Sequence, residues 1–329
     1  MDSWAAALND YGRRGEPCFF LVDFERARPQ VHGLDQETVG AGEASPRFDF
    51  PNRPDPACHP NGLRFPDLTP HHIDPEVFRR AFAVVQAGLH RGDSFLTNLT
   101  FPVPIDLAGD LADVYWLSEA KYRVWLPGQF VSFSPETFVT ISPTGYLETR
   151  PMKGTTQDSP AARAALLTNP KEIAEHATIV DLMRNDLNQV TTQTRVTDYR
   201  YFHKIATSSR GLIQTSSKIG GQLPPDWRAT LGDLLARLLP AGSVSGAPKP
   251  ATLDLIRRAE GQPRGYYCGI AGHFDGTTLD TCVLIRFIEQ QADGGYVFRS
   301  GGGITARSTW REEYAELCAK VRIPLRHEG

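Results

Sequence analysis

The sequence predicts a mixed α+β fold with largely antiparallel sheets, and three observations support this class. Stretches with apolar residues at helical spacing alternate with short runs rich in β-branched and aromatic residues. Several neighbouring β-like runs are joined by hairpin-sized connections, which antiparallel strands allow and parallel strands do not. The 29 glycines and 25 prolines are spread along all 329 residues and separate many short elements. This pattern favours an antiparallel α+β architecture over a doubly wound parallel sheet.

The first half of the chain contains one clear helix among short strands. Asp74 and Pro75 have the pattern of an N-cap followed by proline at the first helical position, and Gly92 marks the end. Residues 31–68 are rich in proline, glycine and acidic residues, and we expect them to be irregular. The expected strands are 18–24, a run that is apolar except for Asp23, and then 94–101, 129–133, 137–142 and 146–147.

The second half continues the same alternation. Helical periodicity predicts helices at 170–187, 227–238 and 248–260, and a last helix that begins near Thr309. The β-like stretches lie at 201–217, 267–274, 279–289 and 296–300.

Composition excludes several classes of protein. With 40% hydrophobic and 22% charged residues the chain is not disordered, and no stretch is long and apolar enough to span a membrane. The net charge of −3 gives no basic excess for nucleic acid or a membrane surface. The N-terminus lacks a signal-peptide pattern, and the five cysteines form no CxxC pair. We therefore expect a cytoplasmic protein with free cysteines and no nucleic-acid or membrane partner.

The first stretch that points to chemistry is Arg150-Pro-Met-Lys-Gly-Thr155. Lys153 stands between a proline and a glycine that lets the backbone approach a ligand closely. A partly desolvated lysine loses its proton more easily and can act as a nucleophile or base. Taken alone, the same pattern also fits an ordinary solvated lysine.

Two ExxE pairs, Glu172/Glu175 and Glu313/Glu316, each place two carboxylates on one helical face. Brought together, they would supply the oxygen ligands that Mg²⁺ prefers. Each pair alone equally fits a solvated helix face.

The remaining stretches are rich in glycine. Residues 240–248 lead into a helix, and Gly301, Gly302 and Gly303 follow a strand, so their backbone amides could hold a carboxylate. Arg286, on an apolar strand, must be paired, either in a structural salt bridge or with a substrate carboxylate. Together these features indicate a small polyanionic substrate, a divalent cation and one reactive lysine.

These phrases occur in an order that resembles the chorismate-utilising enzymes, which include anthranilate synthase component I, aminodeoxychorismate synthase component I, and the isochorismate and salicylate synthases. The similarity runs from about Asp74 to Leu325. Its phrases are GDSFLTNLT at 92–100, SFSPETF at 132–138, PMKGT at 151–155, IVDLMRNDL at 179–187, GSVSGAPK at 242–249, YCG at 267–269 and GGGI at 301–304. The resemblance implies two intertwined subdomains, with antiparallel sheets packed as a sandwich and helices outside. It also implies a short N-terminal region, residues 1–73, before a chorismate-binding catalytic domain, residues 74–329.

Within this family the lysine of the PMKGT phrase is typical of aminodeoxychorismate synthases, where anthranilate synthases have alanine. The resemblance therefore implies conversion of chorismate and ammonia to 4-amino-4-deoxychorismate, the precursor of p-aminobenzoate and folate, through a covalent Lys153 intermediate. No glutaminase segment with a Gly-x-Cys-x-Gly elbow is present, so the ammonia would come from a glutamine amidotransferase partner or from free ammonium.

Roles for individual residues follow from the matching positions. Glu136 corresponds to the general acid, and the four glutamates of the ExxE pairs correspond to the Mg²⁺ ligands. The enolpyruvyl carboxylate would be held by Tyr267, Arg286 and the amides of Gly301, Gly302 and Gly303. The substrate-binding set also includes Thr155, Ser245 and Gly246.

Two departures from the family pattern bear on these expectations. The Leu-x-Glu-Ser phrase of a tryptophan-binding element is missing, and the family's His-Leu-Val-Ser phrase is replaced by 203–207, with Lys204 where the histidine is expected and His203 offset by one position. Two alternatives stay open: an isochorismate, salicylate or anthranilate synthase on the same scaffold, and a chorismate-binding module without catalysis.

Overall fold

The fold is α+β with antiparallel sheets, as the sequence predicts. The computed structural model describes residues 2–34, 45–55, 60, 62–204 and 212–325. Every pairing between its strands is antiparallel. Within this part of the chain, no helix is long and apolar enough to cross a membrane.

The first sheet has the strand order β10-β12-β9-β8-β15-β14-β1-β2, and β11 pairs with β12 outside this path. In chain order its strands are β1 (Cys18–Val22), β2 (Gln30–Gly33), β8 (Thr137–Ile141), β9 (Tyr146–Thr149), β10 (Met152–Gln157), β11 (Thr192–Lys204), β12 (Leu212–Gln222), β14 (Ile270–Phe274) and β15 (Leu279–Val283).

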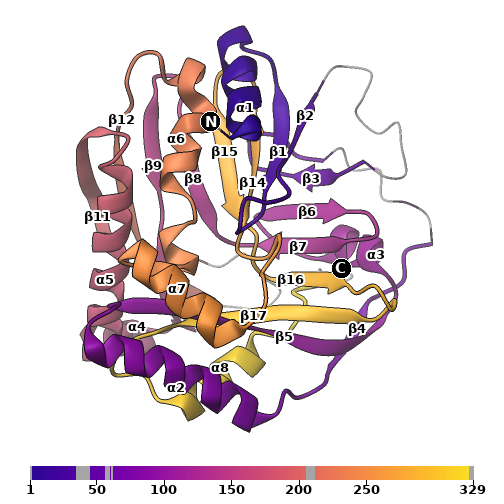
Figure 1. Cartoon of the computed structure of the whole chain (residues 1–329), viewed down its shortest axis with the longest axis vertical. Helices are drawn as coiled ribbons and strands as arrows, with labels where there is room; N and C mark the ends of the chain where they lie inside the picture. Colours follow the sequence, from indigo (N-terminus) through magenta and orange to yellow (C-terminus); the bar gives the residue numbers. More distant parts are fainter. Residues whose placement is uncertain (1, 35–44, 56–59, 61, 205–211, 326–329) are drawn as a thin grey trace.

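The second sheet has the order β13-β5-β17-β16-β7-β6-β3, and β4 pairs with β5. Its strands are β3 (Arg47–Asp49), β4 (Asp67–Pro70), β5 (Leu96–Ala108), β6 (Tyr122–Leu126), β7 (Phe130–Ser134), β13 (Gly246–Ala247), β16 (Phe287–Gln290) and β17 (Tyr296–Ile304). In Figure 1 the strands of the first sheet run from top to bottom, and those of the second sheet run across the molecule below them.

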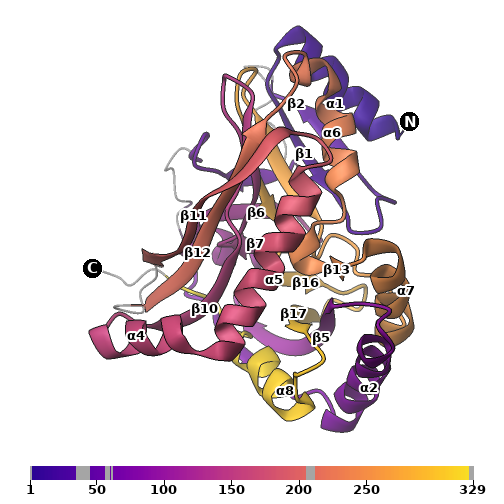
Figure 2. The same cartoon turned by 90° about the vertical axis from the view of Figure 1, so that its left-hand side faces the viewer.

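Helices cover the outside of both sheets (Figures 1 and 2). Beside the first sheet lie α1 (Ser3–Arg14), α4 (Pro160–Thr168), α5 (Pro170–Leu187) and α6 (Leu231–Leu238), and beside the second lie α2 (Pro75–Arg91), α3 (Leu111–Leu117), α7 (Lys249–Glu260) and α8 (Trp310–Ala319). Two 3₁₀ turns, η1 (Trp227–Thr230) and η2 (Gly242–Val244), flank α6. Two clusters of buried apolar side chains result: one contains side chains from both sheets, and the other joins the second sheet to α2, α3, α7 and α8. Figure 2 shows the first turns of α5 next to α8, so the site residues of these two helices can meet.

The helix predictions with clear start signals are confirmed. The Asp74 carboxylate accepts the Glu76 N–H at 2.8 Å, and α2 ends at Gly92 in the left-handed conformation. The helix predicted at 170–187 is α5, with Asn169 as its N-cap. The strand at 18–24 is β1, which lies in the interior of the first sheet between β14 and β2.

Two strand predictions are wrong. The stretch 201–217 is not one strand, because β11 and β12 pair with each other antiparallel; residues 205–211 lie outside the described part. The stretch 279–289 is also not one strand, because the chain leaves the first sheet after Val283 and enters the second at Phe287. An apolar run cannot reveal this break, because both halves are equally buried. The stretch 31–68 was expected to be irregular and contains β3, most of β2 and the start of β4.

Close packing of α1 on α6 gives a prediction for stability. A Cβ atom added to Gly232 would lie 2.1 Å from the Ala5 carbonyl oxygen, a backbone atom that cannot move away alone. We expect Gly232→Ala to lower the free energy of unfolding by about 1–3 kcal/mol through overpacking. Urea denaturation measures this, with Gly295→Ala as the control, since there a Cβ would meet only the Asp293 carboxylate. Equal stabilities of the two variants would contradict the prediction.

Candidate functional site

The candidate site lies where the chain twice crosses between the two sheets. One crossing joins β7 to β8 through Pro135 and Glu136, and the other joins β15 to β16 through residues 284–286. The two crossings are hydrogen-bonded to each other: Val283 N–H donates to the Glu136 carbonyl at 3.1 Å, and Phe133 N–H donates to the Arg286 carbonyl at 3.0 Å. The backbone therefore holds Glu136 and Arg286 close together.

Glu136 has the properties of an acid that can hold its proton. Burial raises the pKa of its carboxyl, while a hydrogen bond from Ser243 and the charges of Lys320 and Lys153 act in the opposite direction. The net effect is a pKa above that of an ordinary glutamate. Ser243 Oγ donates the hydrogen bond to Glu136 Oε1.

Arg286 keeps much of its hydrogen-bonding capacity free. Its Nη1 donates to the Lys320 carbonyl at 2.8 Å, and among the described residues no carboxylate forms an ion pair with it. Burial and the nearby Arg322 lower the pKa of Arg286, and they outweigh the opposing effect of Tyr267 and Glu316. Burial raises the pKa of Tyr267 well above its ordinary value, so this hydroxyl stays protonated. The two side chains offer donors to an anion.

Lys153 reaches the site through an irregularity in β10. The register against β12 shifts between Lys153 and Thr155, and Gly154 between them has φ +71°. A Cβ atom on Gly154 would lie 2.5 Å from Glu172 Oε2, so glycine permits both the backbone conformation and the close approach of α5.

The ammonium group of Lys153 lies among carboxylates. Its Nζ is 2.8 Å from Glu175 Oε2. Burial acts to lower the pKa of Lys153, but Glu175, Glu316 and Glu313 outweigh it and raise the pKa above its ordinary value. Contrary to the expectation for a partly desolvated lysine, Lys153 is thus protonated in this arrangement.

The four glutamates of the ExxE pairs face one another from α5 and α8. Burial and the charges of Glu175 and Glu316 raise the pKa of Glu172, although Lys153 and Lys171 oppose this rise. Burial and Glu316 likewise raise the pKa of Glu313 against the effect of Ser308, Lys171 and Lys153. Burial would raise the pKa of Glu316 too, but Lys320, at 2.8 Å, lowers it. The structure therefore brings together the two pairs that the sequence singled out.

This donor set fits a divalent cation in charge and ligand chemistry, because carboxylate oxygens are the ligands of Mg²⁺. Burial is the largest cause of the raised pKa of Glu172 and Glu313, and repulsion from neighbouring glutamates adds to it, so the negative charge here is incompletely balanced. Within the described part of the chain, no three acidic, histidine or cysteine side chains stand close enough to hold a metal as they are. Glu175 and Glu316 are instead engaged by Lys153 and Lys320.

The glycine run lies inside a strand rather than in a loop after it. In β17, Gly301, Gly302 and Gly303 pair with Thr100, Leu99 and Asn98 of β5. The N–H groups of Asn98 and Thr100 point away from β17, to the Ser245 carbonyl and to Glu260 Oε1. These two residues therefore form non-hydrogen-bonded pairs, and the N–H groups of Gly301 and Gly303 face away from β5. Among the described residues neither N–H group has a backbone partner, so both can donate to an anion at that edge.

The remaining residues predicted for the site have structural contacts of their own, and none of these contacts joins them to Lys153, Glu136 or the ExxE glutamates. Ser245 is fully buried and its hydroxyl donates to the Ala241 carbonyl at 2.8 Å. Gly246 allows β13 to approach β5, because a Cβ there would lie 1.8 Å from the Leu96 carbonyl oxygen. Thr155 pairs with Gln214 through its backbone, and its side chain lies outside the described part of the structure. His203 is on β11, where burial, Lys121 and Arg150 lower its pKa. Their roles stay predictions.

Two site residues were missed in the sequence. Lys320 Nζ donates to the Gly301 carbonyl at 2.8 Å and pairs with Glu316, so it joins the glycine strand to α8. Ser243 contacts Glu136. Lys320 stands four residues after Glu316, and this helical spacing was the available signal.

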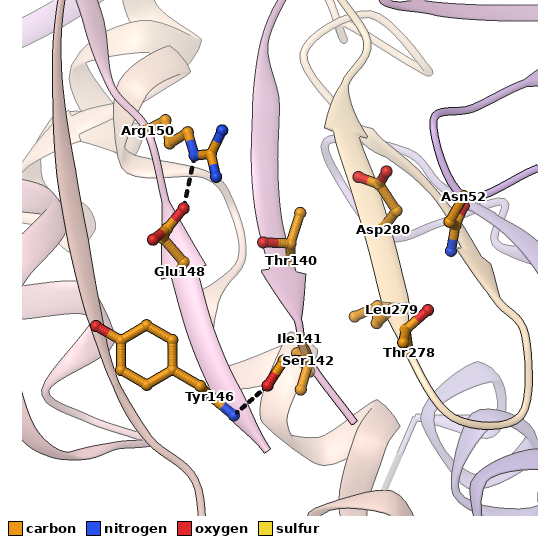
Figure 3. Close-up of a pocket in the computed structure, with 10 residues that line it drawn as sticks. All are labelled: Asn52, Thr140, Ile141, Ser142, Tyr146, Glu148, Arg150, Thr278, Leu279 and Asp280. Atoms are coloured by element: carbon orange, nitrogen blue, oxygen red, sulfur yellow. Dashed lines mark hydrogen bonds and ion pairs between the residues drawn. The ribbon is translucent and has the colours of Figure 1, made fainter. Parts of the chain in front are cut away.

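A separate cavity opens on the first sheet (Figure 3). Its volume is about 340 Å³, and none of the predicted site residues lines it. The Glu148–Arg150 ion pair lies in its wall. The lining residues are Asn52, Thr140, Ile141, Ser142, Tyr146, Glu148, Arg150, Thr278, Leu279 and Asp280.

Comparison with known proteins decides the family. The family profile described as chorismate binding enzyme matches residues 23–326. The chain belongs to the chorismate-binding enzyme family. An "Uncharacterized PabA-like protein" of Haemophilus influenzae is 43% identical to this chorismate-binding chain over 99% of the chain and 97% of that protein.

More distant relatives carry names that state an activity. The "Aminodeoxychorismate synthase component 1" of Salmonella typhimurium is 34% identical over 73% of this chain, and the match covers 55% of that protein. Among solved structures, the menaquinone-specific isochorismate synthase of Escherichia coli superposes with a TM-score of 0.72 at 18% identity, over 97% of this chain and 81% of that one. This last similarity shows the fold.

Proposed function

We propose that this chorismate-binding enzyme is an aminodeoxychorismate synthase component I, which converts chorismate and ammonia to 4-amino-4-deoxychorismate. The observation that carries the proposal is Lys153, which the strand irregularity at Gly154 places beside Glu175 and the other ExxE carboxylates. A relative named for this activity is 34% identical to the chain.

In the proposed reaction Glu136 is the acid and Lys153 is the nucleophile. Glu175, 2.8 Å from Lys153 Nζ, first accepts a proton from the ammonium group of Lys153. The resulting amine forms a bond to ring carbon 2, the double bond shifts, and the bond between carbon 4 and its oxygen breaks. Glu136 gives its proton to the departing hydroxyl, which leaves as water. Ammonia then bonds to carbon 4, the double bond shifts back, and the amine of Lys153 departs. A proton released by the added ammonia returns to Glu136, and Lys153 regains its proton from Glu175, so the enzyme is restored.

Substrate carboxylates are assigned to the two sides of the site. Arg286, Tyr267 and the free amides of Gly301 and Gly303 hold the enolpyruvyl carboxylate, since all of them offer donors. Glu172, Glu175, Glu313 and Glu316 hold Mg²⁺, whose charge, when bound, neutralises these carboxylates and attracts the ring carboxylate of chorismate. The ammonia comes from a glutamine amidotransferase subunit, with free ammonium as its substitute in vitro.

A product assay tests the proposal. The chain is incubated with chorismate, Mg²⁺ and excess ammonium, and products are identified by mass spectrometry. We expect exchange of hydroxyl for amine with the enolpyruvyl group retained, loss of this product in EDTA, and recovery with excess Mg²⁺. An isomer of unchanged mass would indicate an isochorismate synthase instead, and an aromatic amine with released pyruvate would indicate an anthranilate synthase.

The role of Glu136 predicts a pH dependence. A general acid works only while protonated, so kcat falls as the pH rises through its pKa. Because burial raises this pKa, the descending limb lies at higher pH than an ordinary glutamate would give. We expect Glu136→Gln to lower kcat by about 10²-fold or more and to remove this limb, with chorismate binding retained. If the descending limb of the pH profile is unchanged in Glu136→Gln, it reports the titration of another group.

A further inference from the structure

Ser243 lies in the glycine-rich stretch 240–248 that leads into α7, and its hydroxyl contacts Glu136, the acid of the proposed reaction. It belongs to the 3₁₀ turn η2, which contacts α5, β5, β13 and β17. Its hydroxyl donates to Glu136 Oε1. Glu136 also has Lys320, Lys153 and Cys268 in its electrostatic environment, but Ser243 provides the hydrogen bond recorded for its carboxyl.

A partly buried ion pair joins α5 to α7 beside this turn. Lys249, the first residue of α7, places Nζ 3.0 Å from Asp186 Oδ2 and donates to the Leu238 carbonyl at 2.8 Å. Asp186, near the end of α5, is buried. Lys249 thus ties α5 to both chain segments that flank η2.

Glycine at 242 completes this arrangement. A Cβ atom there would lie 2.7 Å from Asp186 Oδ2 and 3.0 Å from Leu182 Cγ. The turn therefore sits directly on α5, the helix that also carries Glu172 and Glu175. The helix α5 therefore carries one ExxE pair and also supports the turn that contains Ser243.

We propose that Ser243 is a positioning residue for Glu136, and that the ion pair of Lys249 with the buried Asp186 holds the turn that presents its hydroxyl. The inference rests on the proposed role of Glu136 as the acid. A carboxyl with one oxygen held by Ser243 has a restricted orientation, so its proton can be directed at the leaving hydroxyl without prior rearrangement.

The first experiment compares Ser243→Ala, Glu136→Gln and the double variant by total chorismate consumption, whichever product forms. We expect S243A to lower kcat by about 10-fold, the worth of one hydrogen bond to a reacting group, with KM within about 2-fold. In the E136Q background the same substitution should have no further effect. Independent losses in the double variant would overturn the proposal.

Controls separate positioning from a structural role. Ser118→Ala makes the same change at a buried serine whose hydroxyl has no partner among the described residues, and it should leave kcat unchanged. Ser243→Thr retains the hydroxyl and should recover most of the lost kcat. Because the Ser243 hydrogen bond lowers the pKa of Glu136, S243A should also move the descending limb of the pH profile upward. A limb that stays in place would contradict the proposal.

The ion pair is tested by removing both charges together. Asp186→Leu/Lys249→Met leaves no unpaired buried charge, so it avoids the main reason for misfolding. We expect a lower kcat with KM retained, and no additional loss on adding S243A. If the folded double variant has the kcat of the wild type, the proposed role of the Asp186–Lys249 ion pair is wrong.

An infrared measurement makes the test independent of turnover. Protonated Glu136 contributes a carboxyl C=O band that E136Q lacks, and loss of a donated hydrogen bond shifts such a band. We expect a shift in S243A and none in Ser118→Ala. An identical band in wild type and S243A would overturn the proposal, whereas a shifted band in a chain that forms a different product would overturn only the proposed function.

Discussion

Replacing Lys153 with methionine is expected to abolish formation of 4-amino-4-deoxychorismate while chorismate still binds. Methionine keeps a similar length and apolar stem but has no amine to attack the ring. Because the covalent route needs this nucleophile, its loss should lower kcat by about 10³-fold or more. Mass-spectrometric product analysis measures turnover, and equilibrium titration with chorismate measures binding.

Lysine 218 offers a matched control for this variant. It lies on β12, the strand that pairs with β10, but its Nζ pairs with Asp198 at the protein surface at 2.7 Å. We expect Lys218→Met to retain wild-type turnover. Substantial product from Lys153→Met would exclude the covalent route.

The covalent route also predicts a trapped species. Without ammonia, the intact wild-type chain should gain the mass of chorismate less one water, because carbon 4 has lost its hydroxyl. Lys153→Met should show no such increase. An adduct that persists in the variant would place the covalent bond on another residue.

The largest stability effect is expected at Arg264, whose side chain is 1% exposed and pairs with Glu260, which is 3% exposed. The guanidinium donates to both Glu260 oxygens, at 2.9 and 2.6 Å, and to the carbonyls of Val244 and Asn98. Arg264→Met would leave the Glu260 carboxylate buried without its cation. We expect the free energy of unfolding to fall by about 3–5 kcal/mol, measured by urea denaturation.

Two further variants identify the cause of this loss. Arg258→Met breaks an exposed pair with Asp254 in the same helix, α7, and should change stability by no more than about 1 kcal/mol. Glu260→Gln/Arg264→Met removes the buried negative charge and should be more stable than Arg264→Met. If the double variant is no more stable, lost packing and not unpaired charge is the cause.

The sequence alone was sufficient for elements whose signals are local. The start and end of α2 follow from Asp74, Pro75 and Gly92, because a cap and a left-handed glycine act within one turn. The bounds of α5 were predicted from helical periodicity at 170–187, and the structure adds Asn169 as its N-cap. The order of motif phrases also identified the family, and with it the residues that meet at the site.

Long-range pairing decided what the sequence could not. Cys18 pairs with Phe274 across most of the chain length, and such pairings assign each strand to one of the two sheets. The crossing at residues 284–286 interrupts an unbroken apolar run, and the glycines at 301–303 form a strand because β5 lies beside them. Neither feature has a local signal, since strand pairing depends on the partner.

The chemistry of the site depends partly on residue types that the sequence shows and partly on contacts that only the fold creates. One lysine and four paired glutamates could be predicted from the residues and their spacing, and the acid Glu136 followed from the family resemblance. Their protonation could not, because the pKa of Lys153 is raised by carboxylates on α5 and α8 that are distant in sequence. The contact of Ser243 with Glu136 exists only because α5 holds the turn η2 against the crossing between the sheets. Local sequence thus determined the residue types and the caps, whereas burial and charge, which depend on distant neighbours, were decided by the tertiary structure.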